Sequence, residues 1–303
     1  MEYDGVSMQP EMRLLITGST GFIGKKLTEK IQGSGSEVIE IPQDLDLEED
    51  DKTSEFITSI DPTHVIHLAN NRKHERESSI EEHQFQVSRV DLNVTTACQR
   101  LKNLNRFITI GTCDEYGRQE EPFLETALAK PTNAYGKSKL ALTQLLMEIS
   151  EKNKFPSVIL RPSVVYGANQ LPDMFISSLF VAMLEQRKIP LTPGNQTRDF
   201  IHVDDVVEAI TLSLKVENIP YGSIFNIATQ RAITIREVAM MIADLFGSKH
   251  KSLLEFGALE YRPSEVMNYR VNAEKATRLL SWNSNIRLED GLSSLKELFT
   301  RGA

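Results

Sequence analysis

Residues 13–27 read RLLITGSTGFIGKKL, and this stretch decides the fold. Its first five residues are an apolar run of strand length, and a helical pattern follows and continues through Gln32. Between the two lie Gly18, Gly21 and Gly24. Glycine suits such a turn because the chain bends tightly, the backbone must approach a pyrophosphate, and the helix must pack close to the strand. Because a strand precedes the glycines and a helix follows them, we predict a dinucleotide-binding turn.

The predicted cofactor site includes this turn and the ends of the following strands. The N-terminus of the first helix would supply backbone donors and partial positive charge to the phosphates of the dinucleotide. The residues assigned to this site are Gly18, Thr20, Gly21, Phe22, Ile23, Gly24, Asp44, Leu45, Leu68, Ala69, Tyr135 and Lys139.

The residues after the second predicted strand bear on the choice between NAD and NADP. An acidic residue at the end of that strand would hold the ribose hydroxyls of NAD. Here the strand runs into residues 42–43 (Pro-Gln), and the first suitable carboxylates are Asp44 and Asp46. Asp44 could instead lie near the adenine. Residues 33–50 contain no Lys or Arg to neutralise a 2′-phosphate, although two lysines of the first helix are close by. The sequence therefore leaves NAD and NADP open and favours NAD.

The rest of the first half alternates short apolar runs with helical patterns. The predicted strands are 37–41, 64–68, 106–110 and 157–161, and the predicted helices are 80–101 and 134–152. Short strands that alternate with helices form right-handed βαβ crossovers and a parallel sheet. We therefore predict an α/β fold with a doubly wound parallel (Rossmann) sheet.

After Tyr166 the pattern changes, and prolines break the chain into shorter pieces. The predicted elements are helices at 175–185, after Asp204 and Asp205, from the Thr234/Glu237 capping box to Phe246, at 272–280 and at 288–299, and a strand at 224–227. We predict a dinucleotide-binding domain over residues 1–165. Residues 166–303 would form mainly a smaller C-terminal α/β substrate domain, with the segment 198–230 returning to the first domain.

Composition and charge exclude several classes of function. With 303 residues, 40% hydrophobic and 25% charged, the chain is typical of a soluble globular protein. Its formal net charge of −8 argues against nucleic acid as a partner, because phosphate backbones bind basic faces. Cys98 and Cys113 have no metal-ligand spacing around them, so we expect no metal site, no disulfide framework and a reducing compartment. Residues 1–11 lack the apolar core of a signal peptide, and no run of about 18 apolar residues could span a membrane. We expect a soluble, cytoplasmic protein with no membrane partner.

Tyr135 and Lys139 lie four residues apart in NAYGKSK (133–139), so both project from one face of the predicted helix. A free phenol has a pKa of about 10 and is a poor base at neutral pH. An adjacent ammonium, together with the positive charge of an oxidised nicotinamide, would stabilise the phenolate. Tyr135 would then act as general acid in reduction and as general base in oxidation.

Thr112 is the candidate hydroxyl, in the loop after the fourth strand (FITIGTCDEYG, 107–117). Ligands bind at the carboxyl ends of parallel strands, where a hydroxyl can donate to a substrate carbonyl. Two alternatives stay open. Thr112 could be a turn residue that satisfies the backbone, and Thr109 is a competing hydroxyl that falls inside the strand.

Seven motifs together are similar to those of the extended short-chain dehydrogenases/reductases, the NAD-dependent epimerase/dehydratase group. They are TGSTGFIG, HLAN, GTCDEYG, NAYGKSK, LRPSVVYG, TRDFIHVDDVV and FNIA, in that order along nearly the whole chain. The resemblance implies that Thr112, Tyr135 and Lys139 are catalytic and that the lysine also binds the nicotinamide ribose. It implies a sugar-nucleotide substrate, with Thr112, Asp114, Arg198 and Arg262 as substrate-binding residues and the two arginines on its phosphates. The alternative for each arginine is a structural salt bridge with a nearby acid.

Other polar residues receive structural assignments. The resemblance implies that Asn93 steadies the active-site helix. His64, His67 and His202 lie in or beside predicted strands, and we expect them in the core or at the sheet edge rather than as ligands or bases. Capping accounts for Asp204 and Asp205, which open a predicted helix.

Departures from the family pattern bear on the reaction. Dehydratases of the group resemble Thr-Asp-Glu, whereas Cys113 and Asp114 follow the threonine here. Elimination of water needs that acid/base pair, so we do not expect dehydration. The 3,5-epimerising reductases resemble Ser-x-Cys, and Cys113 is one position too early for that pattern. Val164 stands where 4-epimerases and dehydratases typically carry Asn, and the short link between the second and third strands resembles that of 4-keto reductases of deoxysugar nucleotides.

We therefore favour reduction of a 4-keto-6-deoxy sugar nucleotide, with the enzyme working on NAD or NADP. A nucleotide-sugar 4-epimerase with tightly bound NAD is the first alternative, because it uses the same three residues. A cofactor-sensing binding protein on the same fold is the second, although a sensor would be free to lose Tyr135.

The resemblance also implies a homodimer. Members of the group often pair the two helices placed here at 80–101 and 134–152 into a four-helix bundle. Leu140, Leu145 and Leu146 could supply the apolar contacts, but a monomer would use the same residues as sheet-facing core.

Overall fold

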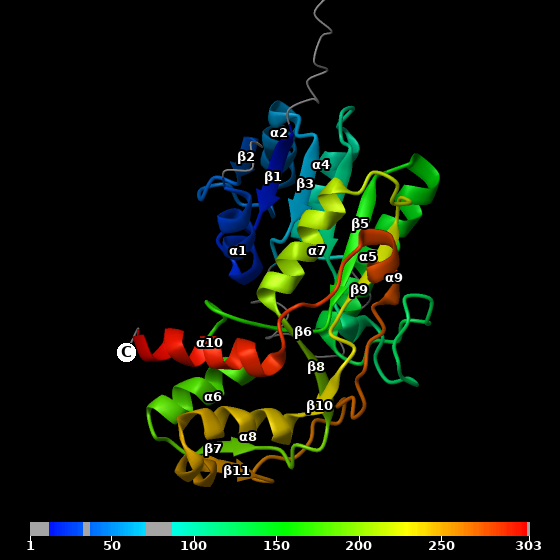
Figure 1. The fold of residues 1–303 in the computed structure, drawn as a ribbon. Coiled ribbons are helices and arrows are strands. Elements are labelled where there is room, and N and C mark those ends of the chain that lie inside the picture. Colours follow the sequence, from blue (N-terminus) through cyan, green and yellow to red (C-terminus); the bar gives the residue numbers. More distant parts are fainter. Residues whose placement is uncertain (1–11, 33–36, 71–86, 302–303) are drawn as a thin grey trace, which may run out of the picture.

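The computed structural model describes residues 12–32, 37–70 and 87–301, and in this part of the chain six strands form a parallel sheet. The strands are β1 (Arg13–Thr17), β2 (Glu37–Glu40), β3 (His64–His67), β4 (Arg106–Ile110), β5 (Ser157–Pro162) and β9 (Ser223–Ile227). Their order is β2-β1-β3-β4-β5-β9, and every neighbouring pair is parallel (Figure 1). The predicted doubly wound parallel sheet is confirmed.

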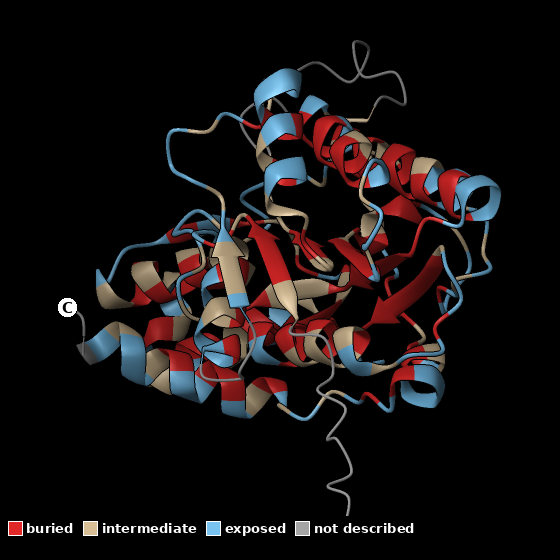
Figure 2. Cartoon of the chain, turned by 90° about the horizontal axis from the view of Figure 1, so that it is seen from above, coloured by how far each residue is buried: buried red, intermediate tan, exposed pale blue. Residues whose placement is uncertain are grey.

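Helices cover both faces of this sheet. On one face lie α1 (Phe22–Ile31), α7 (Val203–Lys215) and α9 (Glu274–Leu280), and on the other α2 (Asp50–Ile60), α4 (Arg89–Gln99) and α5 (Ala134–Asn153). Successive residues of a strand point to opposite faces. Leu14 and Ile16 of β1 accordingly join the first core, and Leu15 joins the second. Because both faces are covered, the strands β1, β3, β4, β5 and β9 are almost wholly buried between the helices (Figure 2). The edge strand β2 differs, since Glu37 and Glu40 at its two ends are exposed.

A smaller layer lies below the large sheet in Figure 1. It contains the sheet β10-β8-β6 and the pair β11-β7, with α6, α8 and α10 packed in a core of their own. The elements are β6 (Val164–Tyr166), β7 (Ile189–Leu191), β8 (Thr197–His202), β10 (Ala232–Thr234), β11 (Leu254–Phe256), α6 (Phe175–Leu184), α8 (Ile235–Phe246) and α10 (Leu288–Arg301). The sequence predicted the helices and missed these strands, which are only three to six residues long. The chain returns to the large sheet through α7 and β9.

Several element boundaries and caps differ from the predictions. Residues 80–86 of the predicted helix 80–101 lie outside the described residues, and α4 begins only at Arg89, after Ser88, whose hydroxyl accepts from Asp91 N. The link between β2 and β3, expected to be short, contains the helix α2. The capping box of Thr234 and Glu237 is confirmed.

The caps of α7 correct a further prediction. His202, not an aspartate, is the N-cap, and its Nδ1 accepts from Asp204 N at 3.2 Å. The carboxylate of Asp205 instead accepts the backbone N–H groups of Asn285 and Ile286, at 3.0 and 3.1 Å. Asp205 therefore fastens the segment before α10 to the start of α7, a contact between residues 80 positions apart.

The helix faces proposed for dimerisation are partly used within the chain. Leu140 and Leu146 are 5% and 0% exposed and belong to the interior, which is the alternative that the sequence left open. Leu145 is half-buried and Leu92 on α4 is exposed. The homodimer and the cytoplasmic location stay predictions.

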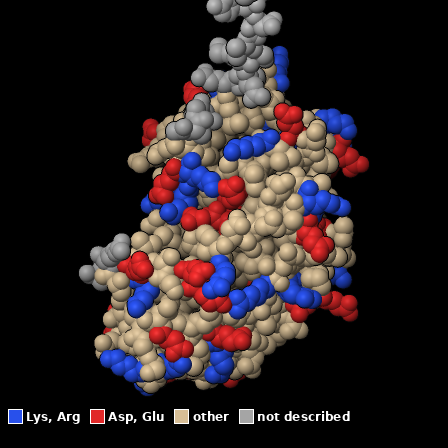
Figure 3. All heavy atoms as spheres, viewed as in Figure 1, with Lys and Arg blue, Asp and Glu red and all other residues tan. Residues whose placement is uncertain are grey.

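The surface carries charges of both signs. On the face seen in Figure 3, Lys and Arg side chains alternate with Asp and Glu, without a broad patch of one sign. In the part of the chain that the structure describes, no helix combines the length and the apolar character needed to cross a membrane.

Candidate active site

The glycine turn lies between β1 and α1 and leaves no room for side chains at two positions. Gly18 has a φ of +72°, and a Cβ there would lie 2.6 Å from Ala69 N. A Cβ at Gly24 would lie 2.1 Å from Gly18 O. These contacts are with backbone atoms, which cannot be displaced cheaply, so both glycines are needed for the close approach of β1, α1 and the end of β3.

The N-terminus of α1 has the features of an anion site. Gly21 is its N-cap, no side chain caps it, and its first turn contains no acidic residue. The backbone N–H groups at such a terminus carry partial positive charge. Thr20 is exposed, and Phe22 and Ile23 are half-buried beside it. These residues fit the pyrophosphate of a dinucleotide.

Four further predicted cofactor residues, Asp44, Leu45, Leu68 and Ala69, follow the neighbouring strands β2 and β3. Leu68 and Ala69 follow β3 and are half-buried, and Ala69 N donates to Thr17 Oγ1 at 3.1 Å. Asp44 is exposed and Leu45 half-buried in the loop between β2 and α2. All of them follow strands of one parallel sheet, the edge where nucleotide ligands bind in such folds.

In the absence of cofactor, replacing Gly24 by alanine should lower the free energy of unfolding by about 1–3 kcal/mol or more, because the new Cβ would overlap backbone atoms. Gly21→Ala is the matched control, since its Cβ would meet only Gly18 O, at 3.2 Å. Thermal unfolding should distinguish the two variants, and titration with NADH should show that Gly21→Ala still weakens binding. A Gly24→Ala protein with wild-type stability would contradict this account of the turn.

Thr112 ends the loop after β4 and caps the short 3₁₀ helix η1 (Cys113–Glu115). Its Oγ1 accepts from Asp114 N at 3.2 Å, and its backbone N–H donates to Glu115 Oε1 at 2.9 Å. The hydroxyl oxygen therefore accepts a hydrogen bond within the turn, as the alternative interpretation held. The hydroxyl can still donate its proton to a ligand. Thr109 donates to His67 O inside the sheet, which accounts for that hydroxyl.

Glu115, which the sequence analysis did not single out, has a buried side chain that joins three elements next to Thr112. Its Oε2 accepts from Thr143 Oγ1 of α5 at 2.9 Å and from Arg161 Nε and Nη2 of β5 at 2.9 and 2.5 Å. The side chains of Glu115 and Arg161 are 0% and 3% exposed. One carboxylate thus fixes η1, α5 and β5 to one another. The Thr-x-x-Glu spacing of a capping box, read correctly at residue 234, was the available signal.

Cys113 and Asp114, the two residues after Thr112, are both held by other groups. Cys113 is fully buried, its thiol donates to Arg161 O at 3.2 Å, and burial raises its pKa well above the usual range. Asp114 Oδ1 accepts from Tyr269 OH and its Oδ2 from Asn133 Nδ2, each at 3.3 Å. The thiol is therefore unsuited to acid/base chemistry.

Tyr135 and Lys139 lie in the first two turns of α5, which packs against η1. Asn133 is the N-cap of this helix: its Oδ1 accepts from Gly136 N at 2.7 Å while its Nδ2 donates to Asp114. Tyr135 is half-buried and Lys139 is 5% exposed. The ammonium of Lys139 lies 4.0 Å from Asp91 Oδ2. The start of α5 is thus fastened beside Thr112.

The two predicted phosphate-binding arginines differ. Arg198 donates to Thr197 O and Val266 O at 2.6 and 2.7 Å and forms an ion pair with Glu265. The structural salt bridge left open by the sequence is therefore present at Arg198. Arg262 is exposed, and no hydrogen bond or ion pair joins its side chain to the described residues.

The other singled-out residues have structural partners. Asn93 Nδ2 donates to Leu47 O at 3.0 Å, so it supports the loop after β2, and its expected role at the active-site helix stays a prediction. His64 contacts Thr63, and His67 lies in the interior between Thr17 and Asp91.

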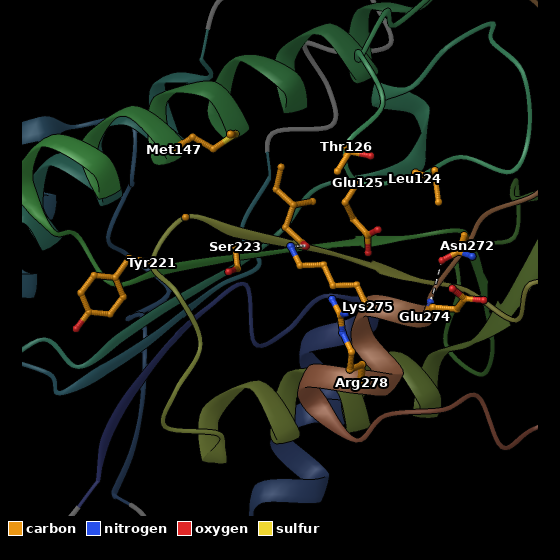
Figure 4. A pocket seen from close by; sticks show the side chains of 12 residues that line it. Leu124, Glu125, Thr126, Met147, Tyr221, Ser223, Asn272, Glu274, Lys275 and Arg278 are labelled. Atoms are coloured by element: carbon orange, nitrogen blue, oxygen red, sulfur yellow. Dashed lines mark hydrogen bonds between the residues drawn. The ribbon is translucent and has the colours of Figure 1, made fainter.

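A cavity of about 680 Å³ lies away from these residues, along the free edge of β9 (Figure 4). Its lining comes from the loop 124–126, α5, the start of β9 and α9, and includes none of the predicted site residues. Lys275 Nζ donates to Ile224 O at 2.8 Å, and Glu125 accepts from Asn226 N at 2.9 Å. These side chains occupy hydrogen-bonding groups that an edge strand would otherwise offer to another strand. We therefore assign the groove to the edge of the sheet rather than to catalysis.

Comparison with known proteins places this geometry in a family. A trifunctional UDP-glucose 4,6-dehydratase/UDP-4-keto-6-deoxy-D-glucose 3,5-epimerase/UDP-4-keto-L-rhamnose-reductase of Arabidopsis thaliana is 28% identical over 210 residues, 68% of this chain and 31% of that protein. A dTDP-L-rhamnose 4-epimerase of Burkholderia thailandensis is 34% identical over 173 residues, 55% of this chain and 46% of that protein. The chain therefore spans less than half of the length of these relatives.

Solved structures agree along the whole fold. The UDP-glucuronic acid 4-epimerase from Bacillus cereus, solved with UDP-glucuronic acid and NAD, has a TM-score of 0.82 and 25% identity, and the match covers 96% of this chain and all of that one. Residues 14–228 match the model of the NAD dependent epimerase/dehydratase family. The resemblance drawn from the motifs is confirmed. The matching family is described as NAD dependent, and the similar structures include one solved with NAD and one solved with NADPH. Because the match covers more than half of the chain, this protein belongs to the NAD-dependent epimerase/dehydratase family.

Proposed function

We propose that this chain is an NAD(P)-dependent oxidoreductase of nucleotide-activated sugars that reduces a 4-keto-6-deoxy sugar nucleotide. The observation that carries the proposal is that two hydrogen bonds hold α5 against η1. Asn133 Nδ2 donates to Asp114, and Thr143 Oγ1 donates to Glu115. These bonds hold Thr112 beside the helix that bears Tyr135 and Lys139. The glycine turn, at the same edge of the sheet, suits the dinucleotide.

The protein side chains have separate roles in this reaction. A bound reduced nicotinamide would supply the hydride. Thr112 donates a hydrogen bond to the keto oxygen of the sugar, and Tyr135 gives that oxygen its proton as negative charge develops on it. Lys139 stabilises the resulting phenolate with its ammonium and binds the nicotinamide ribose. Asp114 and the arginines would contact the remainder of the substrate.

The surroundings of Cys113 favour reduction over dehydration. Elimination of water needs an acid and a base directly after the threonine, and here the first position holds a fully buried thiol bonded to Arg161 O. Reduction needs only Thr112, Tyr135, Lys139 and a hydride donor. NAD is the favoured cofactor, because Asp44 follows β2 and no Lys or Arg occurs in residues 33–50.

A 4-epimerase is the second candidate, and the similarity to the two 4-epimerases supports it. Such an enzyme reduces and reoxidises its cofactor in place. Purified protein distinguishes the two: a reductase consumes added NADH or NADPH with one or more members of a panel of 4-keto sugar nucleotides. An epimerase carries nicotinamide through purification and turns over without added cofactor. If the protein showed neither activity with any member of the panel, the proposal would be rejected.

Replacing the arginines tests recognition of the substrate phosphates. Arg262→Ala should weaken sugar-nucleotide binding about ten- to a hundredfold, because a guanidinium makes charge-assisted bonds to phosphate. It should leave the melting temperature unchanged, since the side chain is exposed. Arg198→Ala should lower both substrate affinity and melting temperature, because it also releases Val266 O and Glu265.

Calorimetric titration with sugar nucleotide and with NADH provides the control for both variants. Cofactor affinity should barely change, because the dinucleotide is assigned to the glycine turn. Equal losses for both ligands, or no loss for either, would refute the separation of the two binding sites.

A further inference from the structure

A buried chain of polar side chains joins the glycine turn to the predicted catalytic lysine. Thr17 Oγ1, at the end of β1, lies 2.7 Å from His67 Nδ1, at the end of β3. His67 Nε2 lies 2.9 Å from Asp91 Oδ1 on α4. The other oxygen of this carboxylate, Oδ2, lies 4.0 Å from Lys139 Nζ on α5. All four residues are at most 5% exposed.

The direction of these hydrogen bonds follows from Asp91. An ionised carboxylate only accepts hydrogen bonds, so His67 Nε2 donates to Asp91 Oδ1. A neutral imidazole that donates at Nε2 accepts at Nδ1, here from Thr17 Oγ1, and this hydroxyl oxygen in turn accepts from Ala69 N–H at 3.1 Å. Thr17, the last residue of β1, is thus linked to the carboxylate of Asp91 through one imidazole.

Asp91 is an ionised carboxylate in the protein interior. Burial would raise its pKa, but the charge of Lys139 and the hydrogen bond from His67 outweigh this and lower it to about 2. Asp91 Oδ2 is fully buried and accepts no hydrogen bond from the residues that the structure describes. The carboxylate therefore interacts with Lys139 as a charge, without the short contact that would draw the ammonium away from other partners.

This arrangement suits a lysine that has to act elsewhere. A buried ammonium has lost its hydration, and a carboxylate at 4.0 Å restores part of that free energy and favours the charged form. Tyr135 lies one turn before Lys139 on the same face of α5.

We propose that Asp91 is a positioning residue that keeps the Lys139 ammonium charged and in place, and that His67 and Thr17 hold Asp91 for this task. The chain Thr17–His67–Asp91–Lys139 thereby connects the strand before the glycine turn with α5 through the interior. The effect on turnover rests on the proposed function, whereas the pairing of Asp91 with Lys139 can be measured without it.

A double-mutant cycle on thermal stability tests the pairing. Asp91→Asn keeps the size of the side chain and one oxygen that can accept from His67 Nε2, and it replaces the charged carboxylate by a neutral amide. In the wild-type background it removes the negative charge of Asp91 from beside a buried ammonium, and the melting temperature should fall by several degrees. In a Lys139→Met background the same change removes an uncompensated carboxylate, and the melting temperature should stay or rise. Equal losses in both backgrounds would overturn the pairing.

Turnover tests the positioning. Asp91→Asn should lower the turnover number about 10- to 100-fold, the scale expected when a catalytic group is misplaced, and should change the Michaelis constant for the sugar nucleotide little. In the Lys139→Met background it should cause no further loss, because Asp91 acts through the lysine. Thr95→Val is the matched control, because it removes another buried hydrogen-bonding group from α4, one turn after Asp91. Thr95 Oγ1 has no hydrogen-bond partner among the described residues. The turnover of Thr95→Val should equal that of the wild type.

The two measurements separate the possible failures. Coupled stabilities with unchanged turnover in Asp91→Asn would make the pair structural and reject the positioning role. If Tyr135→Phe also kept full turnover, the proposed function would be wrong, and the stability cycle would still report on the pair.

Discussion

Tyr135→Phe should lower turnover by at least about 10²-fold, the usual scale for the loss of a general acid or base. Phenylalanine fills the same space in the first turn of α5 and lacks the proton that Tyr135 would give to the keto oxygen. Cofactor affinity should stay close to that of the wild type, because the glycine turn and Lys139 are unchanged. The measurement is steady-state oxidation of reduced cofactor, together with a cofactor titration.

Tyr221→Phe is the control for this experiment. Tyr221 is 51% exposed in the groove beside β9 and lies outside the predicted site, so losing its hydroxyl should not affect turnover. A Tyr135→Phe enzyme that kept more than a tenth of wild-type turnover would reject the assignment of the general acid.

Glu115→Ala should lower the free energy of unfolding by about 3–5 kcal/mol, the range for breaking a buried ion pair. Arg161 would keep its charge in a site that is 3% exposed, and Thr143 Oγ1 and the Thr112 N–H would lose their acceptor. The double variant Glu115→Ala/Arg161→Met should recover part of the loss, because no unpaired charge is left. Urea denaturation of the three proteins measures these differences.

Glu148→Ala is the matched change at the surface. Glu148 forms an ion pair with Lys152 on the same helix, and both side chains are exposed, so its removal should leave the stability within experimental error. A loss in Glu115→Ala no larger than in Glu148→Ala would show that the buried pair does not hold η1, α5 and β5 together.

Local patterns determined the larger sheet and its cofactor turn. The apolar runs at 13–17, 106–110 and 157–161 became strands within a residue of the predicted bounds, because a strand covered on both faces is mostly apolar along its length. The glycine spacing was equally decisive, since the backbone contacts of Gly18 and Gly24 exclude other residues. The capping box at Thr234 is local in the same sense.

Short strands and helix boundaries were harder to predict from the sequence. β6, β7, β10 and β11 have three residues each, too few for alternation to be recognised. Their pairing is set by partners far along the chain, as with β11 and β7. The N-cap of α7 was assigned to the aspartates because they are preferred caps, whereas the fold uses Asp205 for the segment before α10.

The sequence alone determined which residue types stand at the candidate site: Thr112, Tyr135 and Lys139 were named from their spacing and their motifs. Only the tertiary structure decided what surrounds them. Glu115 contacts Arg161, 46 positions further along the chain, and Arg198 contacts Glu265, 67 positions further along. Asp91 and Lys139 lie on two different helices. Residue spacing along a helix or strand reports which side chains share a face, but it does not report which long polar side chain meets which partner across the interior. That choice depends on how the helices pack on the sheet, because each buried charge or polar group requires a partner wherever the packing puts it.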